Sequence, residues 1–120
     1  MQSRDNRTFI AGEDLSAAQF KFVTLEADGQ VDLADAAGEN AIGVCLAGAA
    51  AGAAVTVCVS GSVMVEAGGA ITAGDQIQTG ADGTALLAAT GDVVLGYARE
   101  DGVDGQIIEI EMIQGGNLAA

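Results

Sequence analysis

Two cysteines and a set of carboxylates are the side chains of this 120-residue chain whose types and spacing are best suited to chemistry. Cys45 and Cys58 lie in two predicted strands, residues 41–46 and 55–60. Pairing of these strands as a hairpin would make the two thiols cross-strand neighbours on the faces turned away from the core. We interpret them as two small buried thiols, with redox pairing as the alternative. Two cysteines without any histidine fall short of the four ligands of a usual zinc site, so we expect no metal.

The carboxylates do not form a catalytic pattern. Glu109 and Glu111 alternate with apolar residues, so they share one face of a strand and are interpreted as a solvated row. The loop of residues 99–105 carries three carboxylates, but it lacks the 12-residue pattern of a calcium loop, and weak Ca²⁺ binding stays the alternative. A lipoyl or biotin carrier needs a lysine at a hairpin tip, whereas Lys21 precedes a predicted strand. Since no nucleophile elbow or phosphate loop occurs, we expect no enzyme activity and no cofactor.

A net charge of −13 limits the partners of the chain. Nucleic acids and anionic membranes are bound through Lys and Arg, so neither is an expected partner. Three of the four basic residues, Arg4, Arg7 and Lys21, lie in the first 21 positions, which leaves Arg99 alone among the remaining acids. The acidity itself is interpreted as a source of solubility or, alternatively, as an acidic outer coat with a less acidic docking end.

The elements that must position these side chains occur twice. The pattern of residues 41–61 returns over residues 95–114 at a shift of 53, and residues 23–29 align with residues 77–83 at a shift of 54. Asp-Gly turns between apolar alternations in both copies predict two hairpins. The fold class expected is therefore all-β, a small sandwich or barrel built from two pseudo-repeated β units.

Local signals set the expected boundaries. Residues 16–19, Ser-Ala-Ala-Gln, fit a capping box and predict at most one short helix of one or two turns. Gly61 and Ser62 are expected to separate the strand 55–60 from a strand 63–66. Residues 1–14 have no clear period and are interpreted as an N-terminal arm, followed by a single all-β domain over residues 15–115 and a frayed C-terminal tail, residues 116–120.

The apolar half of the sequence consists mostly of small residues, with 24 alanines and 18 glycines but only four aromatic rings. Such a thin core suggests that subunit contacts complete it. No run of about 18 apolar residues predicts a membrane span, and the first residues lack the apolar segment of a signal peptide. We therefore expect the protein to be made in a cytoplasm, with both thiols reduced.

Four segments, taken in order, resemble the small capsid-decoration, or cement, proteins of tailed bacteriophages. They are AGEDLSAAQFKFVTLEADGQVDLA, AIGVCLAGAAAGAAVTVCVSG, GGAITAGDQIQTGADGTALLAATGD and VLGYAREDGVDGQIIEIEMI, and together they cover residues 11–113. The resemblance implies a β-tulip-like all-β domain that forms a homotrimer on the outer surface of the virion capsid and is assembled in the host cytoplasm. It also implies that the protein clamps neighbouring major capsid protein subunits of the expanded head, without catalysis or cofactor. A β-rich adhesin or tail-fibre-type binding module, with Tyr97 for sugar stacking, is the alternative.

The arm supplies the candidate docking residues. It combines two cations with two apolar side chains, which suits an acidic capsid surface better than the rest of the chain does. Thr8, Phe9 and Ile10 are suited to adding a strand to an exposed sheet edge. The candidate capsid-docking residues are Arg4, Arg7, Thr8, Phe9 and Ile10.

Overall fold

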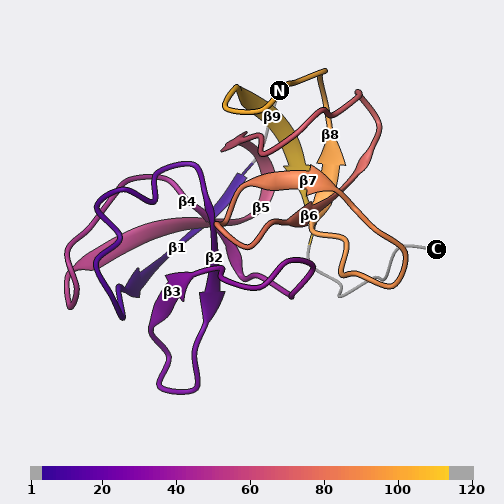
Figure 1. Ribbon diagram of the computed structural model, residues 1–120. Helices are drawn as coiled ribbons and strands as arrows, with labels where there is room; N and C mark the ends of the chain where they lie inside the picture. Colours follow the sequence, from indigo (N-terminus) through magenta and orange to yellow (C-terminus); the bar gives the residue numbers. More distant parts are fainter. Residues whose placement is uncertain (1–3, 114–120) are drawn as a thin grey trace.

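The computed structural model describes residues 4–113, which form nine strands and no helix (Figure 1). The strands are β1 (Arg4–Ile10), β2 (Phe22–Leu25), β3 (Val31–Leu33), β4 (Gly43–Cys45), β5 (Ala54–Glu66), β6 (Gln76–Thr79), β7 (Ala85–Leu87), β8 (Gly96–Ala98) and β9 (Ile107–Met112). No helix capable of spanning a membrane occurs in this part of the chain. The predicted all-β fold is confirmed, whereas the predicted frayed tail, residues 116–120, lies outside the described residues.

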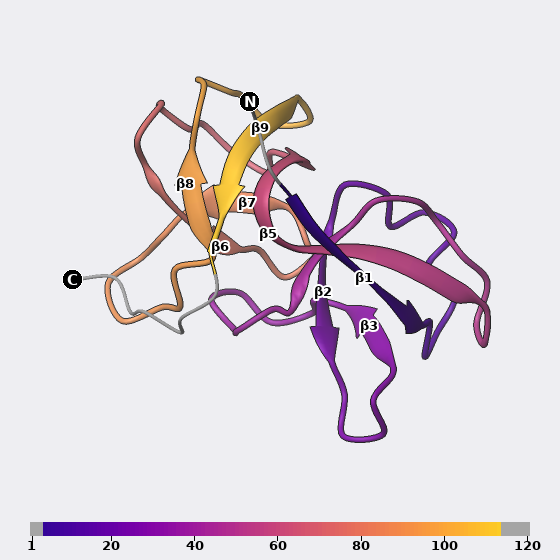
Figure 2. The same cartoon turned by 180° about the vertical axis from the view of Figure 1, so that it is seen from behind.

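All nine strands belong to one antiparallel, strongly curled sheet. Its order is β3-β2-β4-β5-β9-β8-β6-β7, and β1 pairs with the other edge of β5. The two views in Figures 1 and 2 show that β2 and β3 end in a hairpin that projects away from the rest of the molecule. A curled sheet of this kind buries its inner face without a second layer of helices.

β5 is the long central strand that connects the part of the sheet containing β2–β4 with the part containing β6–β9. Its first part pairs with β1 on one edge and with β4 on the other, and its second part pairs with β9. Gly61 pairs with both Arg4 and Met112, and its φ of 95° lies in the left-handed region that glycine adopts freely. The predicted break at Gly61 and Ser62 is therefore wrong, because glycine bends the strand here without ending it.

The predicted repeat is confirmed by the strand register. Val23 lies opposite Leu33 in the β2–β3 pair, and Ile77 lies opposite Leu87 in the β6–β7 pair, each residue 54 positions further on. The β4–β5 and β8–β9 pairs correspond in the same way at a shift of 53. We call residues 4–60 the first half and residues 61–113 the second half, so that β5 is divided between them.

β1 belongs to this repeat. The pairing of Phe9 with Val55 in the first half corresponds to the pairing of Val65 with Ile108 in the second half. The segment expected to be a free arm thus contains the first strand of the first half, and the second part of β5 is its counterpart. Pairing along seven residues holds this segment on the sheet although its sequence is polar.

Each half has its own small core, built from corresponding residues. The core of the first half contains Phe9, Ala11, Leu15, Val23, Val31, Cys45, Val55, Val57 and Val59. The matching residues of the second half are Val65, Ala67, Ile71, Ile77, Ala85, Ala98, Ile108, Ile110 and Met112.

A third group of apolar residues joins the halves. Phe22, Val44 and Cys58 belong to the first half, but they are fully buried and pack into the same cluster as the second-half core. The outer face of β2, β4 and the first part of β5 is therefore covered by the second half. Burial of Phe22, the one aromatic ring that is completely shielded from solvent, anchors this junction.

No helix forms at residues 16–19, which agrees with the expectation of at most one short helix. The chain forms two successive turns there instead, in which Ala18 N donates to Leu15 O and Lys21 N donates to Ala18 O. Leu15 is buried in the first-half core, and Phe20 has a φ of 65°, which ends any helical path. Packing of Leu15 thus outweighs the weak preference of a single helical turn.

Candidate functional site

The five candidate docking residues lie together on β1, the strand that pairs with the first part of β5. Arg4 lies opposite Gly61, Arg7 opposite Val57 and Ile10 opposite Ala54. Along Arg4–Ile10 the other edge of β1 is paired with no strand of the described chain, but directly after it Ala11 bridges Val31 of β3 and Gly12 N donates to Val31 O at 2.8 Å. The free edge of β1 is therefore the part before this bridge, where outward backbone groups are open to a partner. An edge strand of this kind is the surface to which an extended segment of another protein can add.

The side chains of β1 divide between its two faces because successive residues of a strand alternate. Phe9 packs against the first-half core and is half-buried, so it serves the fold. Thr8 and Ile10 point to the opposite face, and Ile10 is 41% exposed. Arg7 is exposed and pairs with Asp5 at 3.3 Å, a contact that solvent screens. Exposed Arg7, Thr8 and Ile10 are therefore the side chains that a partner can contact.

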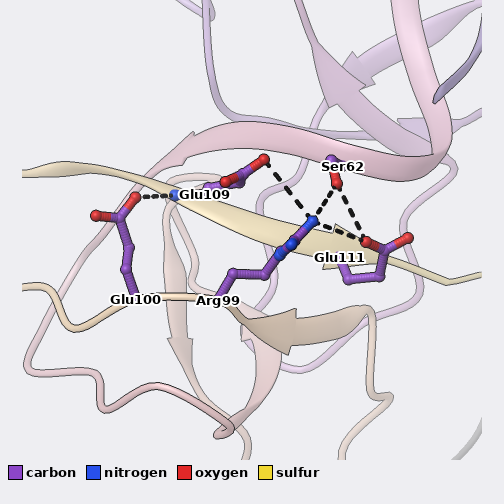
Figure 3. A network of polar contacts seen from close by, with 5 residues as sticks. All are labelled: Ser62, Arg99, Glu100, Glu109 and Glu111. Atoms are coloured by element: carbon purple, nitrogen blue, oxygen red, sulfur yellow. Dashed lines mark hydrogen bonds and ion pairs between the residues drawn. The ribbon is translucent and has the colours of Figure 1, made fainter. Parts of the chain in front are cut away.

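A second polar cluster, which sequence reasoning did not assemble, lies on the second half (Figure 3). Arg99 donates to the hydroxyl of Ser62 at 2.6 Å and lies 3.6 Å from Glu111 and 4.0 Å from Glu109. The Ser62 hydroxyl in turn donates to Glu111 at 3.2 Å. The register of the β8–β9 pair could have predicted this cluster. Tyr97 pairs with Glu111, and the same register brings Arg99, two residues after Tyr97, beside Glu109.

This cluster replaces apolar residues of the first half. The counterparts of Glu111 and Arg99 are Cys58 and Leu46, which pack at the junction between the halves. In the single chain the outer face of β8 and β9 is therefore partly exposed to solvent, in line with the solvated row predicted for Glu109 and Glu111. One arginine shared between two carboxylates lowers their mutual repulsion on this face.

The hairpin of β2 and β3 carries a concentration of carboxylates. Desolvation raises the pKa of Asp32, and the nearby charges of Glu13 and Glu26 raise it further. One oxygen of Asp32, Oδ1, is buried without a hydrogen-bond partner. The second hairpin differs, because a hydrogen bond from Thr84 lowers the pKa of Asp82. The first hairpin thus has the higher density of carboxylates, with Glu26, Asp28 and Asp32 against Asp82 in the second, and desolvation together with their mutual repulsion makes Asp32 the weaker acid.

Cys45 and Cys58 are both free and buried. Cys45 lies opposite Val57, and Cys58 lies opposite Val44, so the two thiols are offset by one residue and belong to different clusters. The prediction that they are cross-strand neighbours on one face is wrong, because this offset sends them to opposite faces of the sheet. Burial also raises the pKa of the Cys45 thiol, which disfavours the reactive thiolate.

The acidic loop of residues 99–105 uses its carboxylates to hold backbone groups. Glu100 accepts a hydrogen bond from Glu109 N at 2.8 Å, and Asp101 accepts one from Ala73 N at 2.8 Å. Within residues 4–113 no group of three His, Cys, Asp or Glu side chains is placed to hold a metal ion, and no pocket is present. The candidate sites of the described chain are therefore exposed strand edges and sheet faces, which suit contacts with another protein.

The family model described as phage cement protein matches residues 1–111. The chain belongs to the phage cement protein family. The match begins before β1 and reaches into β9, so β1 lies within the region that defines the family. Membership places this cement protein among the structural proteins of the phage head.

One solved structure supports the fold of this cement protein. It is the N base of head fiber gp8.5 in bacteriophage phi29, with a TM-score of 0.71 and 22% sequence identity, and the match covers 96% of this chain and 98% of that one. At this identity the likeness shows a shared fold. No curated protein matches the sequence.

Proposed function

We propose that this chain is a non-enzymatic decoration protein that binds the outer surface of the expanded phage capsid as a homotrimer. It clamps neighbouring subunits of the major capsid protein. The observation that carries the proposal is the family match, which extends over residues 1–111 and thus over nearly the whole folded chain. The shared fold with a phage head fibre base supports it.

The physical role of such a protein follows from linkage. A protein that binds the expanded capsid lattice more tightly than the unexpanded one stabilises the expanded state by mass action. A trimer attached through three equivalent strands adds avidity, because dissociation requires all three contacts to open. Internal DNA pressure, which pulls capsid subunits apart, is opposed by each bridge between neighbours.

The docking element that we propose is β1, with Arg4, Arg7, Thr8, Phe9 and Ile10. Its free edge offers backbone groups to an extended capsid segment, and Ile10 supplies an exposed apolar contact. Arg7 supplies a positive charge on a chain whose net charge is −13. Phe9 contributes indirectly by holding β1 on the first-half core.

The test is binding of the purified protein to capsids that lack it, in expanded and unexpanded form, measured by co-sedimentation. We expect binding to the expanded form and a loss of at least about tenfold in affinity for the double variant Arg7→Glu, Ile10→Asp, which removes roughly 1.4 kcal/mol or more. Arg7→Lys keeps the charge, and Val103→Asp changes an apolar side chain that is 62% exposed and lies far from β1 in the sequence. Both controls should bind like the wild type.

Two results would contradict parts of this proposal. Absence of wild-type binding to expanded capsids would refute the decoration function. Full binding by the double variant, with its circular dichroism spectrum unchanged, would move the docking contact away from β1 and leave the decoration function standing.

A further inference from the structure

The two halves of the chain pack head to tail. Gly83, at the tip of the β6–β7 hairpin, accepts a hydrogen bond through its carbonyl oxygen from Phe22 N at 2.8 Å. Thr79, near the start of the same hairpin, accepts one from Gly38 N at 2.9 Å. The β6–β7 hairpin of the second half thus packs against the first half. Figure 1 shows the turn of this hairpin beside the start of β2.

The corresponding contacts in the opposite direction are absent from the described chain. By the repeat, Gly29 and Gln76 correspond to Gly83 and Phe22, yet no hydrogen bond joins them. Space beside Gly29 is open, with no atom within 4 Å of an added Cβ, whereas Leu33, Phe22 and Lys21 crowd Gly83. The internal contact is therefore heterologous, because it joins two different surfaces. The second half contributes its hairpin, and the first half contributes the surface around Phe22 that receives it, which we call the seat. The hairpin of the first half and the corresponding seat of the second half remain free.

The free surfaces carry exposed leucines. Leu25, on the free hairpin, is 50% exposed, whereas its counterpart Thr79 is completely buried. Leu87, on the free seat, is 55% exposed, whereas its counterpart Leu33 is half-buried. The seat also includes Tyr97, 40% exposed, which corresponds to the fully buried Val44.

We propose that these two surfaces bind each other between copies of the chain. We define the free hairpin as residues 25–30 and the free seat as Gly74, Gln76, Leu87 and Tyr97. The free hairpin of one copy occupies the free seat of the next, as the β6–β7 hairpin occupies the seat of the first half. This inference deepens the homotrimer proposed above and rests on it: three copies contain six halves, and a closed ring of six uses every hairpin and every seat.

Charge makes the contact between copies weaker than the internal one. Lys21 lies beside the internal hairpin, with its Cβ 3.2 Å from the position of a Cβ on Gly83. Asp75 takes the place of Lys21 in the second half, where its carboxylate accepts a hydrogen bond from Thr72 N at 2.8 Å. The free seat thus has a negative charge where the internal seat has a positive one, and the free hairpin adds the negative charge of Asp28. Gln76 also replaces the buried ring of Phe22. Repulsion of this kind is screened over about 10 Å at 0.1 M salt, so association strengthens as salt is added.

The first experiment measures mass by light scattering on the full chain at several concentrations and salt levels. Leu25→Glu and Leu87→Glu should each weaken association at least about tenfold, because each places a charge in the contact. Val103→Glu, an equally exposed apolar site outside both surfaces, should associate like the wild type. A mixture of the Leu25→Glu and Leu87→Glu variants should form a 1:1 complex, because each retains the surface that the other has lost.

The second experiment strengthens the contact. Asp75→Asn removes the repulsive charge and keeps a side-chain oxygen that can accept from Thr72 N, so it should shift association to lower concentrations by at least about threefold at low salt. Asp104→Asn makes the same charge change at an exposed loop site. Equal behaviour of these two variants would overturn the inference, as would an oligomer that both leucine variants leave intact. A wild type that stays monomeric at every concentration and salt level would overturn both the inference and the trimer, and capsid binding, measured separately, would still decide the decoration function.

Discussion

Removal of β1 is the perturbation that separates a docking arm from a structural strand. A chain that starts at Gly12 lacks Arg4–Ile10 and the buried residue Ala11. A free arm could be removed without cost to the rest of the fold. The structure instead predicts a destabilised first half, because Phe9 and Ala11 belong to its core.

The magnitude follows from what β1 contributes. Its seven residues make a ladder with β5 whose hydrogen bonds contribute about 1 kcal/mol each, and ordering of the backbone costs about 1 kcal/mol per residue, so these two contributions cancel to first order. The apolar contacts of half-buried Phe9 and fully buried Ala11 remain, at about 3 kcal/mol together. Small domains are stable by roughly 5–15 kcal/mol, so this loss is substantial.

Urea unfolding and amide hydrogen exchange measure this loss. The truncated chain should unfold at a lower urea concentration, and the amides of residues 54–60 that point toward β1 should lose protection. The second part of β5 provides an internal control, because it pairs with β9 and should keep its protection. Phe9→Ala in the full chain should account for about 2 kcal/mol of the loss while the ladder stays intact.

A truncated chain with the unfolding midpoint of the full chain and unchanged exchange along β5 would refute this reasoning. The same result would support the interpretation of residues 1–14 as a separate arm. If β1 holds the fold, truncation alone is a poor test of capsid docking, because it also destabilises the first half. Substitutions at Arg7 and Ile10, which leave the ladder in place, are the sharper test.

Three further predictions concern the interior of the sheet. Gly96→Ala should destabilise the protein by about 3 kcal/mol in urea unfolding, because the new Cβ would overlap the backbone carbonyl oxygen of Glu111. The control Gly69→Ala should be nearly neutral, because the nearest atom to its new Cβ lies at 3.5 Å. Asp32→Asn should stabilise the protein at pH 7 by up to about 1 kcal/mol, because burial raises the pKa of Asp32 and so penalises its charged form. This gain in stability should vanish as the pH falls below the ordinary pKa of 3.8, because Asp32 is then protonated in the unfolded chain as well as in the folded one. A stabilisation that persists at low pH would contradict that cause. Both thiols should react slowly with a disulfide reagent in the native protein and rapidly in denaturant, and a native disulfide between them would contradict their placement on opposite faces.

The sequence was sufficient for the parts of the fold that local signals specify. Each Asp-Gly turn forces a hairpin by itself, so both hairpins and the repeat that contains them follow from short stretches of residues. Gly61 shows the limit of such signals. A glycine after a strand usually marks its end, but here partners on both edges, Arg4 and Met112, keep the chain extended.

β1 was predicted only in part, for a related reason: Thr8, Phe9 and Ile10 were expected to be suited to a strand, whereas the residues before them were interpreted as an arm. Its sequence, RDNRTFI, has no apolar alternation, because an edge strand buries few side chains and is protected by its charges. The pairing of Phe9 with Val55 becomes predictable only when the repeat is extended upstream, where residues 4–10 take the place of the second part of β5. The faces of Cys45 and Cys58 were missed because a register error of one residue inverts every side chain of a strand.

The position of β1 on the sheet changes the energetics of the proposed docking. A free arm of about ten residues would spend on the order of 10 kcal/mol of backbone entropy when it becomes ordered on the capsid. β1 is already ordered by its pairing with β5, so a capsid segment that adds to its free edge meets a preformed partner. Most of the entropy cost then falls on the capsid segment, and more of the contact energy appears as affinity. A preformed edge also explains how the same residues can serve the fold through Phe9 and a partner through Arg7 and Ile10.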